Sequence, residues 1–349
     1  MNTVLSFLEK NSQRLELPRY GAGGKLSALT LTPRFRASSH VVSLILAKGQ
    51  TAPVLVAKVP RLANATTSLE REVGNLRQVQ RLRPEGFTSI PRVVAFETYC
   101  GYPVLVETAI VGPLMDPPFV RRQRDRCCQA VIDWLVALQR TEGDGYAADP
   151  SARGVEWYQR LIEQPLHYFD TYFPLSEQER QLLTRTRHLA ASLQDYGLPL
   201  VFEHGDLSHP NLMLLPNNKP GVVDWELAEP YGLPASDLFF FLTYAAFAMH
   251  KARESERHLP AFKSAFFGRS PWTQRYIRQY VSQLQLPVET LTPLFVVTWL
   301  RYVVGLLQRL DNVNQMPGKF SPQTVNWIRQ SRYYALWEYA VSHADELSW

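Results

Sequence analysis

The chain has 349 residues, 46% of them hydrophobic and 20% charged, which allows two folded domains and excludes an intrinsically disordered protein. Its three cysteines, two of them adjacent, exclude a disulfide framework and indicate a reducing compartment, so we expect a cytoplasmic protein. The net charge of +5 is concentrated in residues 1–110, where 14 Lys and Arg accompany 7 Asp and Glu; this excess suits a polyphosphate ligand or, equally, a solvated basic surface.

The N-terminal segment, MNTVLSFLEKNSQ, has no basic region before its short apolar stretch, so we expect no signal peptide. It predicts a short helix over Val4–Lys10. Three strands are predicted after it, over Ala28–Thr32, Val41–Ala47 and Val54–Val59.

The third of these strands contains a lysine, Lys58, within the apolar run VLVAKV. An ammonium group that is buried without a partner costs several kcal/mol or more, so a lysine in such a run needs an explanation. Lys58 therefore either has a counter-charge nearby or points outward from an edge strand.

A helix is predicted over Thr67–Arg83, because apolar residues recur there at helical spacing. Glu72 lies on or beside the apolar stripe of this helix and can point toward the sheet, so it is our choice for the partner of Lys58. Glu70 is the alternative. A glutamate in the first turn is also favoured by the helix dipole alone, and this explanation suits Glu70 better.

The most informative stretch begins at Val201 and reads VFEHGDLSHPNLMLLPNNKPGVVDWELAEPYGLPASDLFFFL. In it, Asp206 and Asn211 are five residues apart, and Asp224 follows the apolar run GVV. We predict three short strands here, over Leu198–Phe202, Leu212–Leu215 and Gly221–Val223. A small sheet of these strands would hold the three polar side chains at one end.

Two carboxylates and an amide in this arrangement suit phosphoryl transfer. Asp206 would accept the proton of an attacking hydroxyl group, while Asn211 and Asp224 would bind Mg²⁺ on the nucleotide phosphates. Mg²⁺ takes few protein ligands and keeps water and phosphate oxygens, so two side chains suffice. The alternative is that Asp206 and Asn211 only cap turns, as most loop Asp and Asn residues do.

The combination of HGDLSHPN with VVDWELAEPYGLPASDL resembles the aminoglycoside phosphotransferase and choline kinase-like family of small-molecule kinases. The resemblance implies an α+β, two-lobed protein kinase-like fold. A β-rich N-lobe over residues 1–108 would bind the nucleotide, and a mainly helical C-lobe over 109–349 would contain the catalytic hairpin and the acceptor-binding region. The implied cofactors are ATP, or another nucleoside triphosphate, and Mg²⁺.

The resemblance also implies roles for residues of the N-lobe. Lys58 would bind the α- and β-phosphates and Glu72 would hold it in place. The segment 33–40 would lie over the phosphates, with the hydroxyls and backbone amides of Ser38 and Ser39 as candidate contacts. That segment has no glycine, a departure from the protein-kinase pattern.

Further residues are assigned by position in the family pattern. Glu107, Thr108 and Ala109 would contact adenine through backbone groups. His204 and Asp237 would support the catalytic loop structurally; Asp237 also precedes a long apolar helix and fits a helix cap, which is again a structural role.

The sequence thus predicts a kinase that phosphorylates a hydroxyl group of a small molecule. A sugar, a saccharide or lipid precursor, or a natural product is favoured over an aminoglycoside, because the chain is basic and aminoglycosides are polycations. Two alternatives are a pseudokinase that binds nucleotide without turnover and a kinase that acts on a peptide or protein; intact Asp206 disfavours the first, and the short segment between Asp224 and Asp237 disfavours the second.

Near the C-terminus, the longest apolar segment, Pro293–Leu310, is interrupted by Arg301 and Arg309, which favours a buried helix and no membrane insertion. The sequence has no recognition helix, zinc-ligand spacing or RNA-binding signature, so we expect no nucleic-acid partner. The oligomeric state and the identity of the acceptor stay open.

Overall fold

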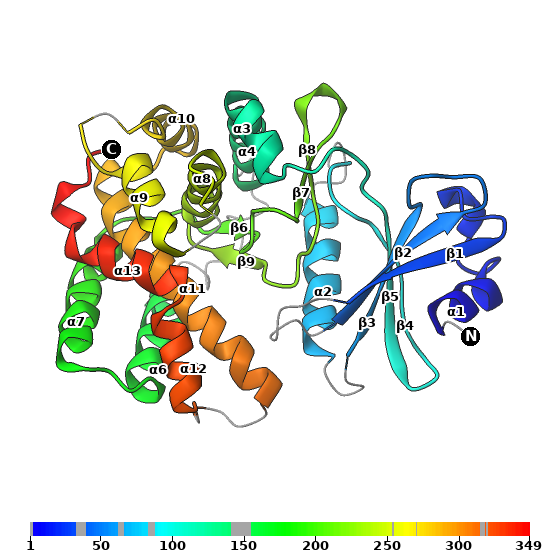
Figure 1. The fold of residues 1–349 in the computed structure, drawn as a ribbon, viewed down its shortest axis with the longest axis horizontal. Helices are drawn as coiled ribbons and strands as arrows, with labels where there is room; N and C mark the ends of the chain where they lie inside the picture. The colour runs from blue at the N-terminus through cyan, green and yellow to red at the C-terminus, as the bar shows by residue number, and fades with distance from the viewer. Residues whose placement is uncertain are drawn as a thin grey trace. The chain divides into compact units, whose positions relative to one another are not determined.

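The computed structural model describes residues 3–32, 40–61, 66–82, 88–140, 155–252, 255–269, 271–314, 318 and 320–349. The chain forms two compact units, drawn as a ribbon in Figure 1. Unit 1 comprises Met1–Leu114 and Pro210–Ala228, and unit 2 comprises Met115–His209 and Glu229–Trp349. The first is rich in β-strands and the second is mainly helical, which confirms the predicted α+β class.

Unit 1 is built on a five-stranded antiparallel sheet with the strand order β1-β2-β3-β5-β4. Its strands are β1 (Leu26–Leu31), β2 (His40–Ala47), β3 (Leu55–Pro60), β4 (Val93–Tyr99) and β5 (Tyr102–Thr108). β3 lies in the middle of the sheet, with Lys58 opposite Val42 of β2 and Leu105 of β5. Lys58 is therefore not on an edge strand.

Helices cover both faces of this sheet, as Figure 1 shows. Phe7 and Leu8 of α1 (Thr3–Asn11) pack in one apolar cluster with the strand residues Val104 and Val106. On the other face, α2 (Thr67–Leu82) packs against Leu105, which points the opposite way because side chains alternate along a strand. The second face is thus the one on which α2 can bring polar side chains to Lys58.

The segment 210–228 adds a short hairpin to unit 1, with β7 (Leu212–Leu214) antiparallel to β8 (Pro220–Val222). It is tied to the N-terminal part of the chain, because Leu114 bridges to Met213 and the Val222 N–H donates to the Ser89 carbonyl. The compact units therefore differ from the predicted ranges 1–108 and 109–349 chiefly by this hairpin.

Unit 2 contains most of the helices. They are α3 (Pro117–Arg122), α4 (Arg124–Gln139), α5 (Val155–Tyr158), α6 (Gln164–Tyr172), α7 (Glu177–Ala191), α8 (Ser236–Met249), α9 (Ser255–Phe266), α10 (Gln274–Leu284), α11 (Leu291–Asn314), α12 (Pro322–Arg329) and α13 (Arg332–Ser342). The helical stretch Val288–Asp311, which includes most of α11, is long and apolar enough to cross a membrane, but 78% of its most apolar part is buried inside the protein. It is therefore a core helix of unit 2, as the arginines within it predicted.

One prediction about the sheets is wrong. The strand before the HGD motif, β6 (Val201–Glu203), pairs with β9 (Glu229–Gly232) and not with the β7–β8 hairpin. The buried Glu203 of β6 stabilises this strand pair. Its side chain accepts a hydrogen bond from the Leu233 N–H and forms an ion pair with Arg301 at 2.9 Å. These partners lie far away in the sequence, so strand length and turn residues alone did not reveal them.

The close fit of β9 against Glu203 predicts a stability effect at Gly232. A Cβ atom at Gly232 would lie 2.6 Å from Glu203 Cβ, which forces one of the two strands to move. We expect Gly232→Ala to destabilise the protein by about 1–3 kcal/mol, measured as a lower Tm in calorimetry. Gly74→Ala on α2 is the control, because a Cβ atom there meets no other atom and alanine favours the helix. An unchanged Tm for Gly232→Ala would contradict this fit.

Candidate active site

Lys58 is the centre of a buried cluster of charges in unit 1. Its side chain is 5% exposed, and its Nζ lies 2.5 Å from Glu72 Oε1 and 3.6 Å from both Glu107 Oε1 and Asp224 Oδ1. Glu70, the alternative partner, is exposed on the outer face of α2. The counter-charge that the apolar strand demanded is thus Glu72, with two more carboxylates nearby.

Burial and the neighbouring charges shift the pKa values of Lys58, Glu107 and Glu72. Burial disfavours the charged form of Lys58, but the negative charges of Glu107, Glu72 and Asp224 outweigh it and raise the pKa of the ammonium well above its usual value. Burial raises the pKa of Glu107 to about 8, although the attraction of Lys58 opposes this. Burial also raises the pKa of Glu72, again opposed by Lys58.

Two side chains of α2 also hold the loop that carries Asp224. Glu72 Oε1 accepts a hydrogen bond from the Trp225 N–H at 3.1 Å. One turn further on, the Asn75 amide donates to the carbonyls of Trp225 and Ala228, at 2.9 and 3.0 Å. The Trp225 ring is fully buried, and its Nε1 donates to the Val222 carbonyl. α2 therefore positions both Lys58 and the loop after β8.

Asn211 and Asp224 stand at the same end of the β7–β8 hairpin. Leu212 is paired with Val222, and the next residue pair is closed by a hydrogen bond from the Val223 N–H to the Asn211 carbonyl. Asn211 is buried, whereas the Asp224 side chain is 32% exposed. Asp224 has a φ of 69°, a strained conformation for a residue other than glycine, and such strain is typical of functional sites.

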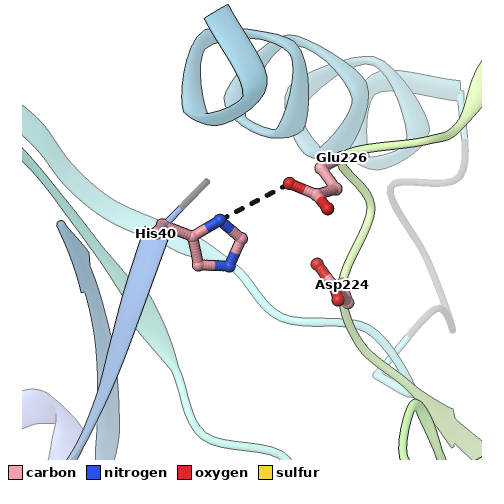
Figure 2. A group of neighbouring side chains, drawn as sticks. All are labelled: His40, Asp224 and Glu226. Carbon is pink, nitrogen blue, oxygen red and sulfur yellow. Dashed lines mark ion pairs between the residues drawn. The ribbon is translucent and has the colours of Figure 1, made fainter. Parts of the chain in front are cut away.

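Two residues that sequence reasoning missed, His40 and Glu226, lie beside Asp224. Figure 2 shows His40, from β2, facing Glu226 and Asp224 of the loop after β8. One possible ligand atom from each of the three lies within 4.8 Å of the others, and His40 Nδ1 is 3.4 Å from Glu226 Oε2. Burial favours neutral His40, yet its hydrogen bond with Glu226 raises the pKa of the imidazole above its usual value. The sequence signal for Glu226 was its place two residues after Asp224.

The chemistry of these donors fits Mg²⁺. The carboxylates of Asp224 and Glu226 and the amide of Asn211 offer the hard oxygen atoms that Mg²⁺ prefers, whereas the His40 imidazole is a poorer ligand for it. Three carboxylates, those of Glu72, Asp224 and Glu226, lie in this part of unit 1 with the single ammonium of Lys58, which favours the binding of a divalent cation.

In unit 2, the HGD loop is shaped by buried hydrogen bonds. The backbone N–H groups of His204 and Gly205 donate to the two carboxylate oxygens of Asp237, and the Asp206 N–H donates to His204 Nδ1 at 3.2 Å. Gly205 has a φ of 82°, which favours glycine before Asp206. Burial and the nearby Glu203 raise the pKa of Asp237 to about 7, although both N–H donors oppose this. His204 and Asp237 thus have contacts that suit structural support.

The remaining predicted contacts differ in outcome. The N–H groups of Thr108 and Ala109 donate to the carbonyls of Arg92 and Val54, so these two donors are already bonded within the protein. The Glu107 side chain belongs to the Lys58 cluster, which position in the family pattern did not indicate. Ser38 and Ser39 lie outside the described residues.

We expect Lys58 and Glu72 to act as one unit in turnover. Lys58→Ala and Glu72→Ala should each lower kcat/KM by about 100-fold or more, and the double variant should lose little beyond the worse single one, because residues in one contact are not additive. Glu70→Ala is the matched control on the exposed side of α2 and should be mild. Steady-state kinetics of the four variants tests this prediction. Full additivity of the two single losses in kcat/KM would show that Lys58 and Glu72 do not act together.

Several solved structures with a similar fold are small-molecule kinases by their names. A microcompartment-associated aminopropanol kinase superposes with a TM-score of 0.56 at 15% identity, over 97% of this chain and 99% of that one. An aminoglycoside 2'-phosphotransferase-IIIa in complex with GDP gives 0.55 at 15% identity, over 98% and 99%. The choline kinase LicA from Streptococcus pneumoniae gives 0.54 at 11% identity, over 96% and 99%. The chain therefore has the protein kinase-like fold of such enzymes.

A search among curated proteins by sequence finds no significant match. A family model, by contrast, matches residues 36–271, which span Lys58, the HGD loop and Asp224. This is more than half of the chain, and it agrees with the resemblance in the HGDLSHPN block and with the fold. The chain belongs to the phosphotransferase enzyme family.

Proposed function

We propose that the protein transfers the γ-phosphoryl group of ATP, or of another nucleoside triphosphate, to a hydroxyl group of a small molecule. The observation that carries this proposal is Lys58, buried in the middle of the sheet with Glu72 at 2.5 Å and Asp224 at 3.6 Å. A buried ammonium held among carboxylates is costly to build, and phosphate binding accounts for it. Membership in the phosphotransferase enzyme family supports the reaction class.

In this proposal, unit 1 binds the nucleotide. The Lys58 ammonium contacts the α- and β-phosphates, and Glu72 keeps it in place. Asn211 and Asp224 hold Mg²⁺, with Glu226 as a further oxygen donor from the same loop. Bound Mg²⁺ would supply positive charge to the phosphate oxygens. The protein's own contribution is to position these groups, because phosphoryl transfer needs little covalent work from side chains.

Asp206 is the group in unit 2 that would receive the hydroxyl proton. Its carboxylate accepts a hydrogen bond from the Ser208 hydroxyl at 3.3 Å. The Asp206 backbone is held by His204, and His204 in turn by Asp237. A carboxylate held in this way can orient an acceptor hydroxyl and remove its proton during attack on the γ-phosphorus.

Several narrower statements are part of the proposal. The acceptor is a sugar, a saccharide or lipid precursor, or a natural product, and the enzyme works in the cytoplasm without a nucleic-acid partner. The similar structures are named for aminopropanol, choline and aminoglycosides, but their low identity to this chain supports the fold and not the acceptor. A pseudokinase or a peptide kinase is the competing function.

Purified protein incubated with radiolabelled ATP, Mg²⁺ and a broad acceptor panel tests the proposal. We expect transfer of label to at least one small hydroxyl compound, and its loss when Mg²⁺ is removed by a chelator. Nucleotide binding with no transfer to any small compound would favour the pseudokinase, and transfer to peptides alone would favour the peptide kinase.

A further inference from the structure

Unit 2 contains a pocket next to Asp206. Its volume is about 220 Å³, below the range of roughly 300–1,000 Å³ that is typical of sites for drug-sized ligands, so it suits a small molecule. Ser208 and His209 form part of its lining, and the Ser208 hydroxyl donates to the Asp206 carboxylate. An alcohol bound in this pocket would therefore lie beside the proposed base.

The charged side chains that line the pocket are cationic. Arg121 at the end of α3, Lys251 after α8 and Arg332 at the start of α13 line it, and no Asp or Glu is among the described lining residues. None of these three side chains belongs to an ion pair in the described part of the chain. Three cations that form no ion pair with the described residues, all lining one small pocket, favour an anionic ligand.

The contacts of the two arginines leave donors for such a ligand. Arg121 Nη1 donates to the Ala248 carbonyl at 2.9 Å, which uses one of the five N–H groups of a guanidinium. The Arg332 guanidinium lies 4.8 Å from the centre of the Tyr333 ring and donates to the Tyr333 hydroxyl. The remaining N–H groups of each fork suit carboxylate or phosphate oxygens, which accept paired hydrogen bonds from guanidinium.

The other walls are aromatic. Phe240, Trp299 and Tyr333 line the pocket, and Tyr302 stacks on Phe240 at 4.2 Å and on Tyr333 at 5.5 Å between ring centres. Such stacked rings form a rigid apolar surface for the carbon skeleton of a ligand. The pocket thus combines a place for a small carbon body with a cationic rim.

Resting on the phosphotransferase function proposed above, we propose that the acceptor is a small alcohol that also carries an oxyanion, either a phosphate monoester or a carboxylate. Arg121, Lys251 and Arg332 bind the oxyanion, and the hydroxyl lies on the Ser208 side of the pocket. In the reaction, the hydroxyl oxygen forms a bond to the γ-phosphorus, the bond from this phosphorus to the bridging oxygen breaks, ADP leaves with that electron pair, and the proton passes to Asp206.

A matched set of three-carbon acceptors tests this inference, because only one substituent changes. We would compare glycerol, glycerol 3-phosphate, glycerate and 3-amino-1,2-propanediol, and in parallel ribose and ribose 5-phosphate. We expect kcat/KM to be at least about tenfold higher for an anionic member than for its neutral partner, and lowest for the amine. Comparing kcat/KM for glycerol 3-phosphate with kcat/KM for glycerate shows whether the pocket prefers a phosphate or a carboxylate.

Variants of the rim separate charge recognition from folding. Arg121→Gln, Lys251→Gln and Arg332→Gln should each raise KM for the anionic acceptor about tenfold and leave KM for ATP unchanged. Arg122→Gln is the matched control, since Arg122 neighbours Arg121 on α3 but is exposed and does not line the pocket. A rise in NaCl concentration should weaken the binding of the anionic acceptor and leave the binding of the neutral one unchanged.

Calorimetry with the same compounds tests acceptor binding separately from phosphorylation, so an error about the acceptor can be told from an error about the kinase activity. One outcome is that the anionic compounds bind, with weaker binding in the rim variants, while no compound is phosphorylated. This result would support an anion-binding pocket and reject the kinase activity. Phosphorylation that prefers neutral or amino alcohols would support the kinase and overturn the inference. If no anionic member binds at millimolar concentration, the inference is overturned as well.

Discussion

Asp206→Asn is expected to lower kcat by about 100-fold or more while the affinity for ATP stays within about twofold of the wild type. The amide keeps the size of the side chain and can still accept a hydrogen bond from Ser208, but it cannot take a proton from the acceptor. A positioned general base is worth about 10²–10⁴ in rate. Single-turnover kinetics and calorimetry with ATP measure the two quantities separately.

The control for this substitution is Asp195→Asn, at an exposed position of unit 2. It removes the same charge away from the HGD loop and should leave kcat unchanged. If kcat of Asp206→Asn stays within about tenfold of the wild-type value, Asp206 is not the general base, because the loss of a general base lowers the rate by more than that.

Asp224→Asn is expected to abolish the dependence of nucleotide affinity on Mg²⁺. Asparagine tolerates the left-handed conformation that Asp224 adopts, so the loop should keep its shape while the charge is lost. Removing this negative charge also lowers the pKa of Lys58, because Asp224 is one of the groups that raise it. Asn211→Ala should have the smaller effect, since Asn211 carries no charge.

Calorimetric titrations of ATP at several Mg²⁺ concentrations decide this prediction. The wild type should bind ATP more tightly as Mg²⁺ rises, whereas the Asp224→Asn curve should be flat. Glu70→Gln on the exposed face of α2 is the charge-matched control. Identical Mg²⁺ dependence in Asp224→Asn and the wild type would exclude a metal-binding role for Asp224.

The sequence predicted the contact between Lys58 and Glu72 because both signals are local. A lysine in an apolar strand demands a partner, and the next helix offered a glutamate on its inner face. Glu107 was assigned only a backbone role, although its carboxylate lies 3.6 Å from Lys58. It reaches Lys58 because β5 pairs with β3, and pairing between strands separated in sequence cannot be derived from the periodicity of either strand.

The same reason explains the other residues that were missed. In the sequence, Asn75 is an ordinary polar residue of a helix. Only the folded chain shows that its amide donates hydrogen bonds to the carbonyls of Trp225 and Ala228. β9 has the sequence EPYG, which lacks the alternation that predicts a strand, and it forms because β6 supplies a partner. Contacts between distant segments set these features, whereas the HGD loop and the hairpin could be predicted from their own residues.

Through its two hydrogen-bonding side chains, α2 controls the geometry of the proposed nucleotide site. Glu72 and Asn75 lie one turn apart on the same face, and together they hold Lys58 and the loop of Asp224. A displacement of α2 would therefore break its contacts with Lys58 and with the loop of Asp224 at the same time. An inhibitor that binds the outer surface of α2 would not need to compete with ATP, and resistance to it would not arise from changes in the residues that contact the nucleotide.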